Sequence, residues 1–275
     1  MYTLLFLKRR VMEFVVNVFT HNGKGGNKAG VVMLKEDISK EECQKKAKDL
    51  GFSETVFVKK ISEKIFELKF YTPQCEIEFC GHASLGAFYI LKKTGIIGEG
   101  EYIERLDFKD LKVRVEEREI FLEQDSIKIE KMSEIEKILN SIGIKKEELH
   151  ENLEIVIGYS GLRDILIPVK NKKVLNNLKI DLKKIKYISK DYSAVGYHVY
   201  TIENNRVFCR NFAPLYGIDE EAATGSSNGA LFGYLNTIER YKSDYLEFFQ
   251  GENYGACSKI TGRVIDGKIY VGSEF

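Results

Sequence analysis

The chain has 275 residues, which is enough for two domains of about 100–150 residues each. Its 42 Lys and Arg nearly balance its 41 Asp and Glu, so the net charge does not indicate binding to nucleic acid or to an anionic membrane. Five cysteines without a CxxC spacing and four scattered histidines argue against a disulfide framework and against a dedicated metal site. We therefore expect a soluble, cytoplasmic globular protein that holds no metal.

Residues 1–11 begin with a short apolar run whose charges follow it instead of preceding it. The run is too short to span a bilayer and has no small-residue cleavage site. A second methionine, Met12, stands just before the strand-like residues 14–19. We predict that residues 1–11 are an extension, from an upstream start or a disordered end, outside the fold.

The first half begins with a strand from Glu13, a glycine-rich loop and a second strand. The loop lacks the Gly-Lys-Ser/Thr ending of a phosphate-binding P-loop, and a flexible loop is the better interpretation. A helix at 38–50 follows, with Ser39 as N-cap, Glu42 at the capping-box distance and Gly51 just after the end. Further elements are expected as strands at 55–59 and 65–71, a short helix at 84–91, and antiparallel strands between 102 and 129.

The second half alternates helical and strand patterns in a similar way. Helices are expected at 132–139, 145–149 and 227–235, and strands at 154–157, 163–169, 194–201 and 206–212. The chain closes with strands 258–264 and 268–271, which Asp266-Gly267 joins as a hairpin turn.

A repeated pattern links the two halves. Residues 70–73 lead to the turn at 80–87, and residues 211–214 lead to a matching turn at 223–230. Each copy has an aromatic-plus-proline strand end, a small-residue turn and an apolar helix. The repeat predicts an α+β protein of two similar halves, 12–130 and 131–275, each a curled, mostly antiparallel sheet around a buried helix. The last strand is free to pack back on the first half.

The two helix starts are candidate anion sites. Free N–H groups at a helix N-terminus attract carboxylates, and glycine lets a ligand approach the backbone, although Gly81 and Gly225 could also serve only tight turns. Two such turns that face each other across a cleft would hold a small anionic substrate. His82, at the first start, is expected to have a lowered pKa and to be neutral. Cys80 is either a poised thiolate or a buried apolar residue.

Carboxylates near these turns are candidate proton carriers. Glu54 is flanked by Phe52, Val56 and Phe57, and partial desolvation would raise its pKa toward that of a general base, unless it is simply a solvated loop residue. The acidic cluster at 219–221 precedes the second turn, where its alternative role is to cap the helix dipole.

Several motifs in order closely resemble the PhzF phenazine-biosynthesis-like family of isomerases over about residues 13–272. The matching segments are 17–20, 51–55, 71–73 with 80–84, 159–164, 212–214 with 223–226, and 250–251. The resemblance implies a diaminopimelate-epimerase-like fold with the site between its halves. It also implies cofactor-free proton transfer on a small carboxylated substrate, commonly in a homodimer.

The resemblance also implies residue roles. Glu54 would be the acid/base, and His82 and Glu221 would act on the substrate beside it. The residues expected to bind substrate are Gly81, Ala83, Thr224, Gly225 and Ser226. Three positions depart from the family pattern: Glu221 stands where aspartate is usual, Ala222 stands where proline is usual, and Asn17 also replaces an aspartate.

Two other hypotheses stay open at this point. Cys80 stands where cysteine-dependent racemases carry their first thiol, which would allow an epimerase or dehydratase, but the matching position in the second half is Thr224. The departures at Glu221 and Asn17 would also suit a small-anion binder that has lost catalysis.

Overall fold

The structure is a computed structural model that describes residues 2–7, 11–255 and 257–275. The chain divides into two compact units, which are described separately: Met1–Glu123 with Gly272–Phe275, and Gln124–Val271. The division falls at 123/124 rather than at 130/131, because β10 (Lys128–Lys131) pairs along its whole length with β11 (Val156–Tyr159) of unit 2.

The N-terminal segment takes part in the sheet of unit 1. Strand β1 (Tyr2–Leu7) pairs antiparallel with β2 (Val11–Val18), and Val11 is buried. Leaving residues 1–11 out of the fold was therefore wrong for Tyr2–Leu7 and for Val11. Residues 1 and 8–10 lie outside the described residues.

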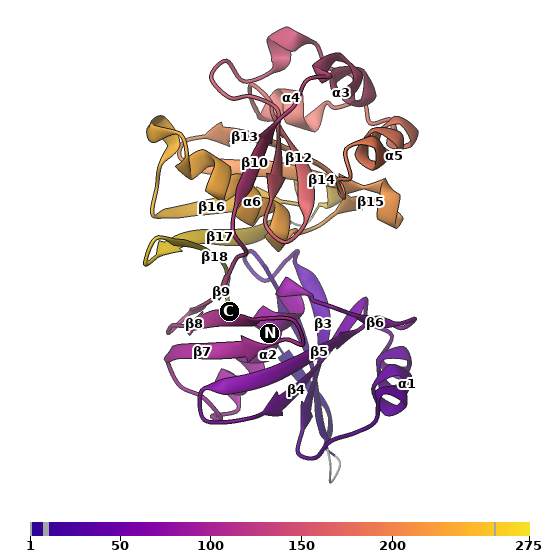
Figure 1. Cartoon of the computed structure of the whole chain (residues 1–275), viewed down its shortest axis with the longest axis vertical. Coiled ribbons are helices and arrows are strands. Elements are labelled where there is room, and N and C mark those ends of the chain that lie inside the picture. The colour runs from indigo at the N-terminus through magenta and orange to yellow at the C-terminus, as the bar shows by residue number, and fades with distance from the viewer. Residues whose placement is uncertain (1, 8–10, 256) are drawn as a thin grey trace. The chain divides into compact units, whose positions relative to one another are not determined.

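Unit 1 is a sheet with one helix on each face (Figure 1). Paired neighbours run in the order β1, β2, β3, β4, β5, β7, β8, β9, and the pairs β3–β4 and β5–β7 are parallel while the others are antiparallel. The remaining strands are β3 (Asn27–Leu34), β4 (Glu54–Lys60), β5 (Ile65–Tyr71), β6 (Glu76–Ile77), β7 (Gly100–Arg105), β8 (Asp110–Val115) and β9 (Glu119–Glu123).

Helix α2 (Gly81–Lys93) contacts β2, β3, β4, β8 and β9 on the inner face, whereas α1 (Lys40–Leu50) packs on β4 and β5. Helix α1 confirms the predicted caps: Ser39 and Glu42 form both hydrogen bonds of a capping box, and Gly51 ends the helix in the left-handed conformation.

Unit 2 repeats this plan (Figure 1). Neighbouring strands run in the order β10, β11, β12, β13, β14, β16, β17, with β12–β13 and β14–β16 parallel, and β15 also pairs with β14. These strands are β12 (Arg163–Pro168), β13 (Gly196–Glu203), β14 (Arg206–Ala213), β15 (Ile218–Glu221), β16 (Tyr245–Gln250) and β17 (Ser258–Ile265), and β18 (Lys268–Glu274) follows.

The central helix of unit 2 is α6 (Gly225–Asn236), which contacts β11, β12 and β17 and is buried without a break over residues 227–235. Helices α3 (Ile135–Ile142), α4 (Lys172–Asn176) and α5 (Leu182–Asp191) form a second apolar core with the strands on the other face. A sheet around a buried helix in each unit confirms the α+β prediction.

Several elements differ from the predictions. The helix expected at 145–149 is the single 3₁₀ turn Lys146–Glu148, and α4, α5 and β16 were not predicted. The predicted hairpin at Asp266-Gly267 is confirmed, with both residues at positive φ. The other 3₁₀ turns are Pro214–Tyr216, Glu239–Tyr241 and Glu252–Tyr254.

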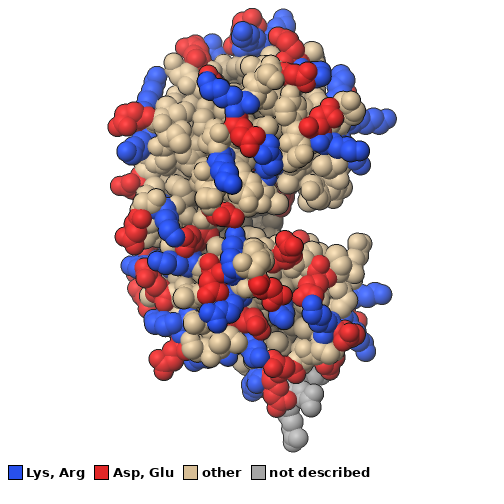
Figure 2. Space-filling model, viewed as in Figure 1, with Lys and Arg blue, Asp and Glu red and all other residues tan. Residues whose placement is uncertain are grey.

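The surface bears both signs of charge. On the face that Figure 2 shows, basic and acidic side chains are interspersed over each unit, as the balanced composition predicts. Among the described residues, no helix is long and apolar enough to cross a membrane.

Candidate functional site

Three predicted residues of unit 1 lie together at the start of α2. Glu54 is the first residue of β4, Cys80 is the N-cap of α2, and His82 is the second residue of that helix. His82 Nε2 lies 3.3 Å from Glu54 Oε2, and His82 Nδ1 lies 3.3 Å from Cys80 Sγ. The imidazole therefore stands between a carboxylate and a thiol.

The pKa values of Glu54 and His82 are shifted in directions opposite to those predicted. Burial raises the pKa of Glu54, but the hydrogen bond and the charge of His82 lower it by more than burial raises it. The net pKa lies below the usual 4.5. Burial lowers the pKa of His82, but Cys80 and Glu54 outweigh burial, and the net pKa lies well above 6.5. Both predicted directions were wrong, because each group finds a partner of opposite charge.

The same three residues could hold a metal ion. Glu54, Cys80 and His82 each offer one donor atom, all within 4.8 Å of one another. An oxygen, a sulfur and a nitrogen suit zinc, with a fourth position open. The composition had led us to expect no metal site.

Both central helices begin with the same backbone geometry. The N-caps Cys80 (φ −150°, ψ 104°) and Thr224 (φ −130°, ψ 101°) are extended, and neither side chain caps its helix. The first-turn N–H groups of both helices thus lack the usual side-chain acceptor, as an anion site requires. Of the predicted binding residues there, Ala83 is fully buried, while Gly81, Gly225 and Ser226 are partly exposed.

In unit 2, Glu221 is the last residue of β15 and Thr224 is the N-cap of α6. The Thr224 hydroxyl donates to Glu221 Oε2 at 2.9 Å, and the backbone N–H of Thr224 donates to Gln250 Oε1 at 3.2 Å. Glu221 and Thr224 thus form one hydrogen-bonded group at the start of α6. Cys80 and Thr224 also occupy the same N-cap position in their units, so the thiol has no counterpart in unit 2.

A buried carboxyl group lies beneath each central helix. Glu104 Oε1 bonds the Ser84 hydroxyl at 2.7 Å, and burial raises the pKa of Glu104 to about 8. Asp164 Oδ2 accepts from the Ser227 hydroxyl at 2.7 Å, and burial raises the pKa of Asp164 to about 7. Among the described residues, neither carboxyl group has a partner for its second oxygen.

No role was predicted from the sequence for these carboxyl groups or for Gln250. Asp164 and Gln250 stand inside motifs that carried the family resemblance. Glu104 lies outside those motifs, on β7, where it and Tyr102 are both buried.

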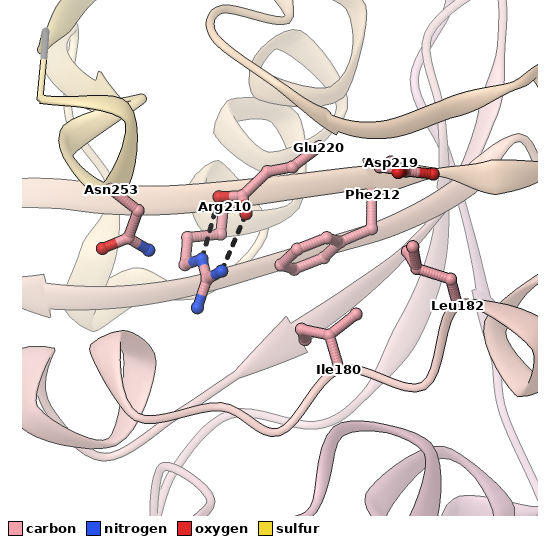
Figure 3. A pocket seen from close by; sticks show the side chains of 7 residues that line it. All are labelled: Ile180, Leu182, Arg210, Phe212, Asp219, Glu220 and Asn253. Atoms are coloured by element: carbon pink, nitrogen blue, oxygen red, sulfur yellow. Dashed lines mark hydrogen bonds and ion pairs between the residues drawn. The ribbon is translucent and has the colours of Figure 1, made fainter.

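A pocket of about 240 Å³ lies elsewhere in unit 2 (Figure 3). Arg210 and Glu220 form a two-pronged ion pair in its wall, with distances of 2.9 Å and 2.7 Å. Its other lining residues are Ile180, Leu182, Phe212, Asp219 and Asn253. Asp219 and Glu220, of the predicted acidic cluster, line this pocket, whereas Glu54, His82 and Glu221 do not. Its ion pair joins the neighbouring strands β14 and β15.

The chain is similar to proteins named as isomerases. It is 28% identical over 253 residues to the uncharacterized isomerase YfhB of Bacillus subtilis, which covers 88% of this chain and 86% of the relative. It is 30% identical over 229 residues to an uncharacterized isomerase of Deinococcus radiodurans, with 80% and 74% covered.

Solved structures share the fold. A PhzF-family phenazine biosynthesis protein of Bacillus anthracis has a TM-score of 0.80 at 24% identity, with 96% of this chain and 94% of that chain covered. A probable proline racemase from Agrobacterium radiobacter has a TM-score of 0.60 at 10% identity, with 97% and 90% covered.

The family model described as "Phenazine biosynthesis-like protein" matches residues 16–271, which is nearly the whole chain. With the repeated sheet-and-helix units and the motifs at both helix starts, this match places the chain in the PhzF phenazine-biosynthesis-like protein family.

Proposed function

We propose that the protein is an isomerase that moves a proton within a small carboxylated substrate. The observation that carries this proposal is the contact between Glu54 and His82, which are 3.3 Å apart and have pKa values shifted in opposite directions. At neutral pH the carboxylate is ready to accept a proton and the imidazolium is ready to donate one. A proton shift needs both functions beside one substrate.

The roles of the residues follow from this pair. Glu54 removes a proton from a carbon next to an unsaturated or carboxyl group and returns it elsewhere on the same molecule. His82 and Glu221 donate to or hold polar groups of the substrate. The first-turn backbone at Gly81, Gly225 and Ser226 stabilises carboxylate or enolate charge, since preorganised N–H groups stabilise developing negative charge.

The test is a screen in heavy water. The protein is incubated with a panel of small unsaturated, amino and hydroxy carboxylates, and mass spectrometry detects deuterium at carbon. We expect uptake into one substrate class and a loss of at least about 100-fold in Glu54→Gln, which cannot take a proton. Glu63→Gln, the same change at an exposed position of unit 1, is the control and should keep full uptake. Unchanged uptake in Glu54→Gln would refute the assignment.

Two alternatives give different outcomes in the same screen. Cys80 Sγ lies 3.3 Å from His82 Nδ1, so a cysteine-dependent epimerase or dehydratase predicts that Cys80→Ser abolishes uptake. An anion binder without catalysis predicts binding but no uptake. Full uptake after exhaustive treatment with a chelator would support the cofactor-free mechanism against use of the three donors as a metal site.

We also propose that the protein forms a homodimer, as its family resemblance implies. Sedimentation velocity at micromolar concentration measures this directly, and a single species of 31.6 kDa would contradict it.

A further inference from the structure

The side-chain amide of Gln250 is fully buried at the end of β16 and uses all of its hydrogen-bonding capacity. Its Nε2 donates to the Glu221 carbonyl at 2.8 Å and to the Thr224 hydroxyl at 2.9 Å. Its Oε1 accepts from the Thr224 N–H at 3.2 Å and from Asn228 Nδ2 at 3.1 Å. A primary amide has two donor hydrogens and an oxygen with two lone pairs, so no capacity is left over.

These bonds reach the Glu221 carboxylate through one hydroxyl group. The Thr224 hydroxyl has a single hydrogen, which it donates to Glu221 Oε2. It must therefore accept from Gln250, and the bonds run in one direction from Gln250 through Thr224 to Glu221. The amide thus fixes both the backbone and the carboxylate that precede α6.

Neighbouring buried groups determine which way these amides point. Asn228 Nδ2 donates to Gln250 Oε1 and to the Thr224 carbonyl, so Asn228 Oδ1 is an acceptor. His198 Nε2 contacts that oxygen at 3.2 Å, while His198 Nδ1 faces Asn211 Nδ2 at 3.2 Å. His198 is consequently a neutral imidazole with its hydrogen on Nε2. Burial also lowers the pKa of His198 to about 4, so this arrangement persists across the neutral range.

We propose that Gln250 is a positioning residue, which holds the Glu221 carboxylate and the first turn of α6 in the arrangement that an anionic substrate needs. This inference rests on the proposed function for its purpose. Its structural core, a segment at 221–226 held by one amide, is testable without any substrate.

The first test measures hydrogen exchange of the Thr224 backbone amide, which donates to Gln250 Oε1, in the full-length protein. Gln250→Leu removes both donor hydrogens and the acceptor oxygen at similar volume, and we expect exchange to become at least about 30-fold faster, since several buried polar groups lose their partner. Gln44→Leu is the control, because Gln44 donates a single hydrogen bond, to the Thr72 carbonyl in unit 1. Exchange in Gln250→Leu within twofold of wild type would overturn the proposal.

Gln250→Glu covers the case in which the leucine variant does not fold. A protonated glutamic acid keeps the acceptor and one donor, whereas a carboxylate keeps no donor. Relative to wild type at the same pH, exchange of the Thr224 amide should therefore be near normal at low pH and accelerate as the new carboxyl group ionises. A ratio that stays constant with pH would contradict the proposal.

The second test uses whichever substrate the heavy-water screen identifies. Gln250→Leu should lower kcat by about 30- to 100-fold and change KM less, because a displaced catalytic group affects the reacting geometry more than substrate binding. Wild-type kcat in Gln250→Leu would overturn the inference. If wild-type protein takes up no deuterium, the proposed function fails, and the exchange measurement alone decides the inference about Gln250.

Discussion

Glu54 and His82 are each partly buried, which by itself would favour the neutral form of both groups. A full charge pair at 3.3 Å attracts by about 5 kcal/mol at an effective dielectric constant of 20, which exceeds the cost of partial burial. The pair is therefore ionised between the lowered pKa of Glu54, below 4.5, and the raised pKa of His82, above 6.5. Within this window its attraction also stabilises the fold, and that contribution is lost as the pH falls through the pKa of Glu54 or rises through that of His82.

The pair predicts a bell-shaped pH dependence of kcat/KM, with its limbs on either side of this window. In His82→Gln the carboxylate loses its cation but stays partly buried, so the pKa of Glu54 should rise above 4.5. Carbon-13 NMR of the Glu54 carboxyl group in both proteins measures this shift without any substrate. The assignment fails if the Glu54 pKa is the same or lower in His82→Gln.

The hydrogen bonds of Glu104 leave room for a proton on its carboxyl group. The Ser84 hydroxyl contacts both the Cys80 carbonyl, at 3.1 Å, and Glu104 Oε1, at 2.7 Å, but has one hydrogen to donate. If Glu104 is protonated, its O–H donates to Ser84, and Ser84 donates to Cys80. The pKa of about 8, raised by burial, agrees with this arrangement.

Glu104 should make the protein less stable as the pH rises. The unfolded chain ionises this residue near pH 4.5 but the folded chain only near pH 8, so the unfolding free energy falls between these values, by on the order of 4–5 kcal/mol. Glu104→Gln removes the ionisation, so the unfolding free energy of this variant relative to wild type should increase through this pH range. Urea unfolding of both proteins from pH 5 to pH 8 measures the difference.

Asp164→Asn serves as a comparison, because Asp164 has the same kind of contact in unit 2 but a pKa of about 7. The unfolding free energy of Asp164→Asn relative to wild type should stop increasing near pH 7. A difference between Glu104→Gln and wild type that does not depend on pH would show that Glu104 is ionised in the fold.

At the scale of elements, strands pack closely against both central helices. In α2, Gly86 lets strand β2 come close to the helix. A Cβ added at Gly86 would lie 2.5 Å from Val16 Cγ1, and Val16 is fully buried on β2. At Gly81 an added Cβ would meet nothing closer than 3.7 Å, at Phe79.

We predict that Gly86→Ala lowers the unfolding free energy by about 1–2 kcal/mol, because overpacking costs more than the roughly 1 kcal/mol gained in helix propensity. Gly81→Ala, at the first position of the same helix, should leave stability within about 0.5 kcal/mol. Urea unfolding tests both variants. Equal stabilities would mean that β2 can move away from α2.

Local signals predicted the elements that have their own caps and turns. The capping box of α1 and the hairpin at Asp266-Gly267 depend on residues close together in sequence, and both are confirmed. Helix α5 has such a signal, the N-cap Asp181 with buried Ile185 and Ile188, but the lysines among these residues obscure the apolar spacing. Strand β16 is short and lacks strict alternation, and it is defined by its pairing with β14 and β17.

The members of the Glu54, Cys80 and His82 cluster could be named from the sequence, but the direction of their pKa shifts could not. Residue types and motifs indicated Glu54, Cys80 and His82, and the structure brings these three together. The sign of each pKa shift depends on a partner that is distant in sequence, and no local pattern reveals it. The role of Gln250 likewise depends on four contacts made across the fold of unit 2.

At the scale of the whole molecule, the chain passes between its units twice. It leaves unit 1 after Glu123 and returns for its last four residues. Within unit 1 these residues make specific contacts: the Ser273 hydroxyl accepts from the Phe19 N–H at 2.9 Å, and the Phe275 N–H donates to the Arg118 carbonyl at 2.9 Å. The C-terminal residues thus complete the sheet of the unit in which the chain began.

Phe275 also stacks on Tyr89 of α2, with ring centroids 4.3 Å apart and planes 10° from parallel. We predict that Phe275→Ala lowers the unfolding free energy by about 1–2 kcal/mol, from the lost stacking and apolar contact. Hydrogen exchange should become faster in α2 and β2 and stay unchanged in α6. Phe108→Ala, at a ring that is 54% exposed, is the matched control and should stay within about 0.5 kcal/mol of wild type. Faster exchange in α6 would show that the C-terminal residues stabilise unit 2 as well.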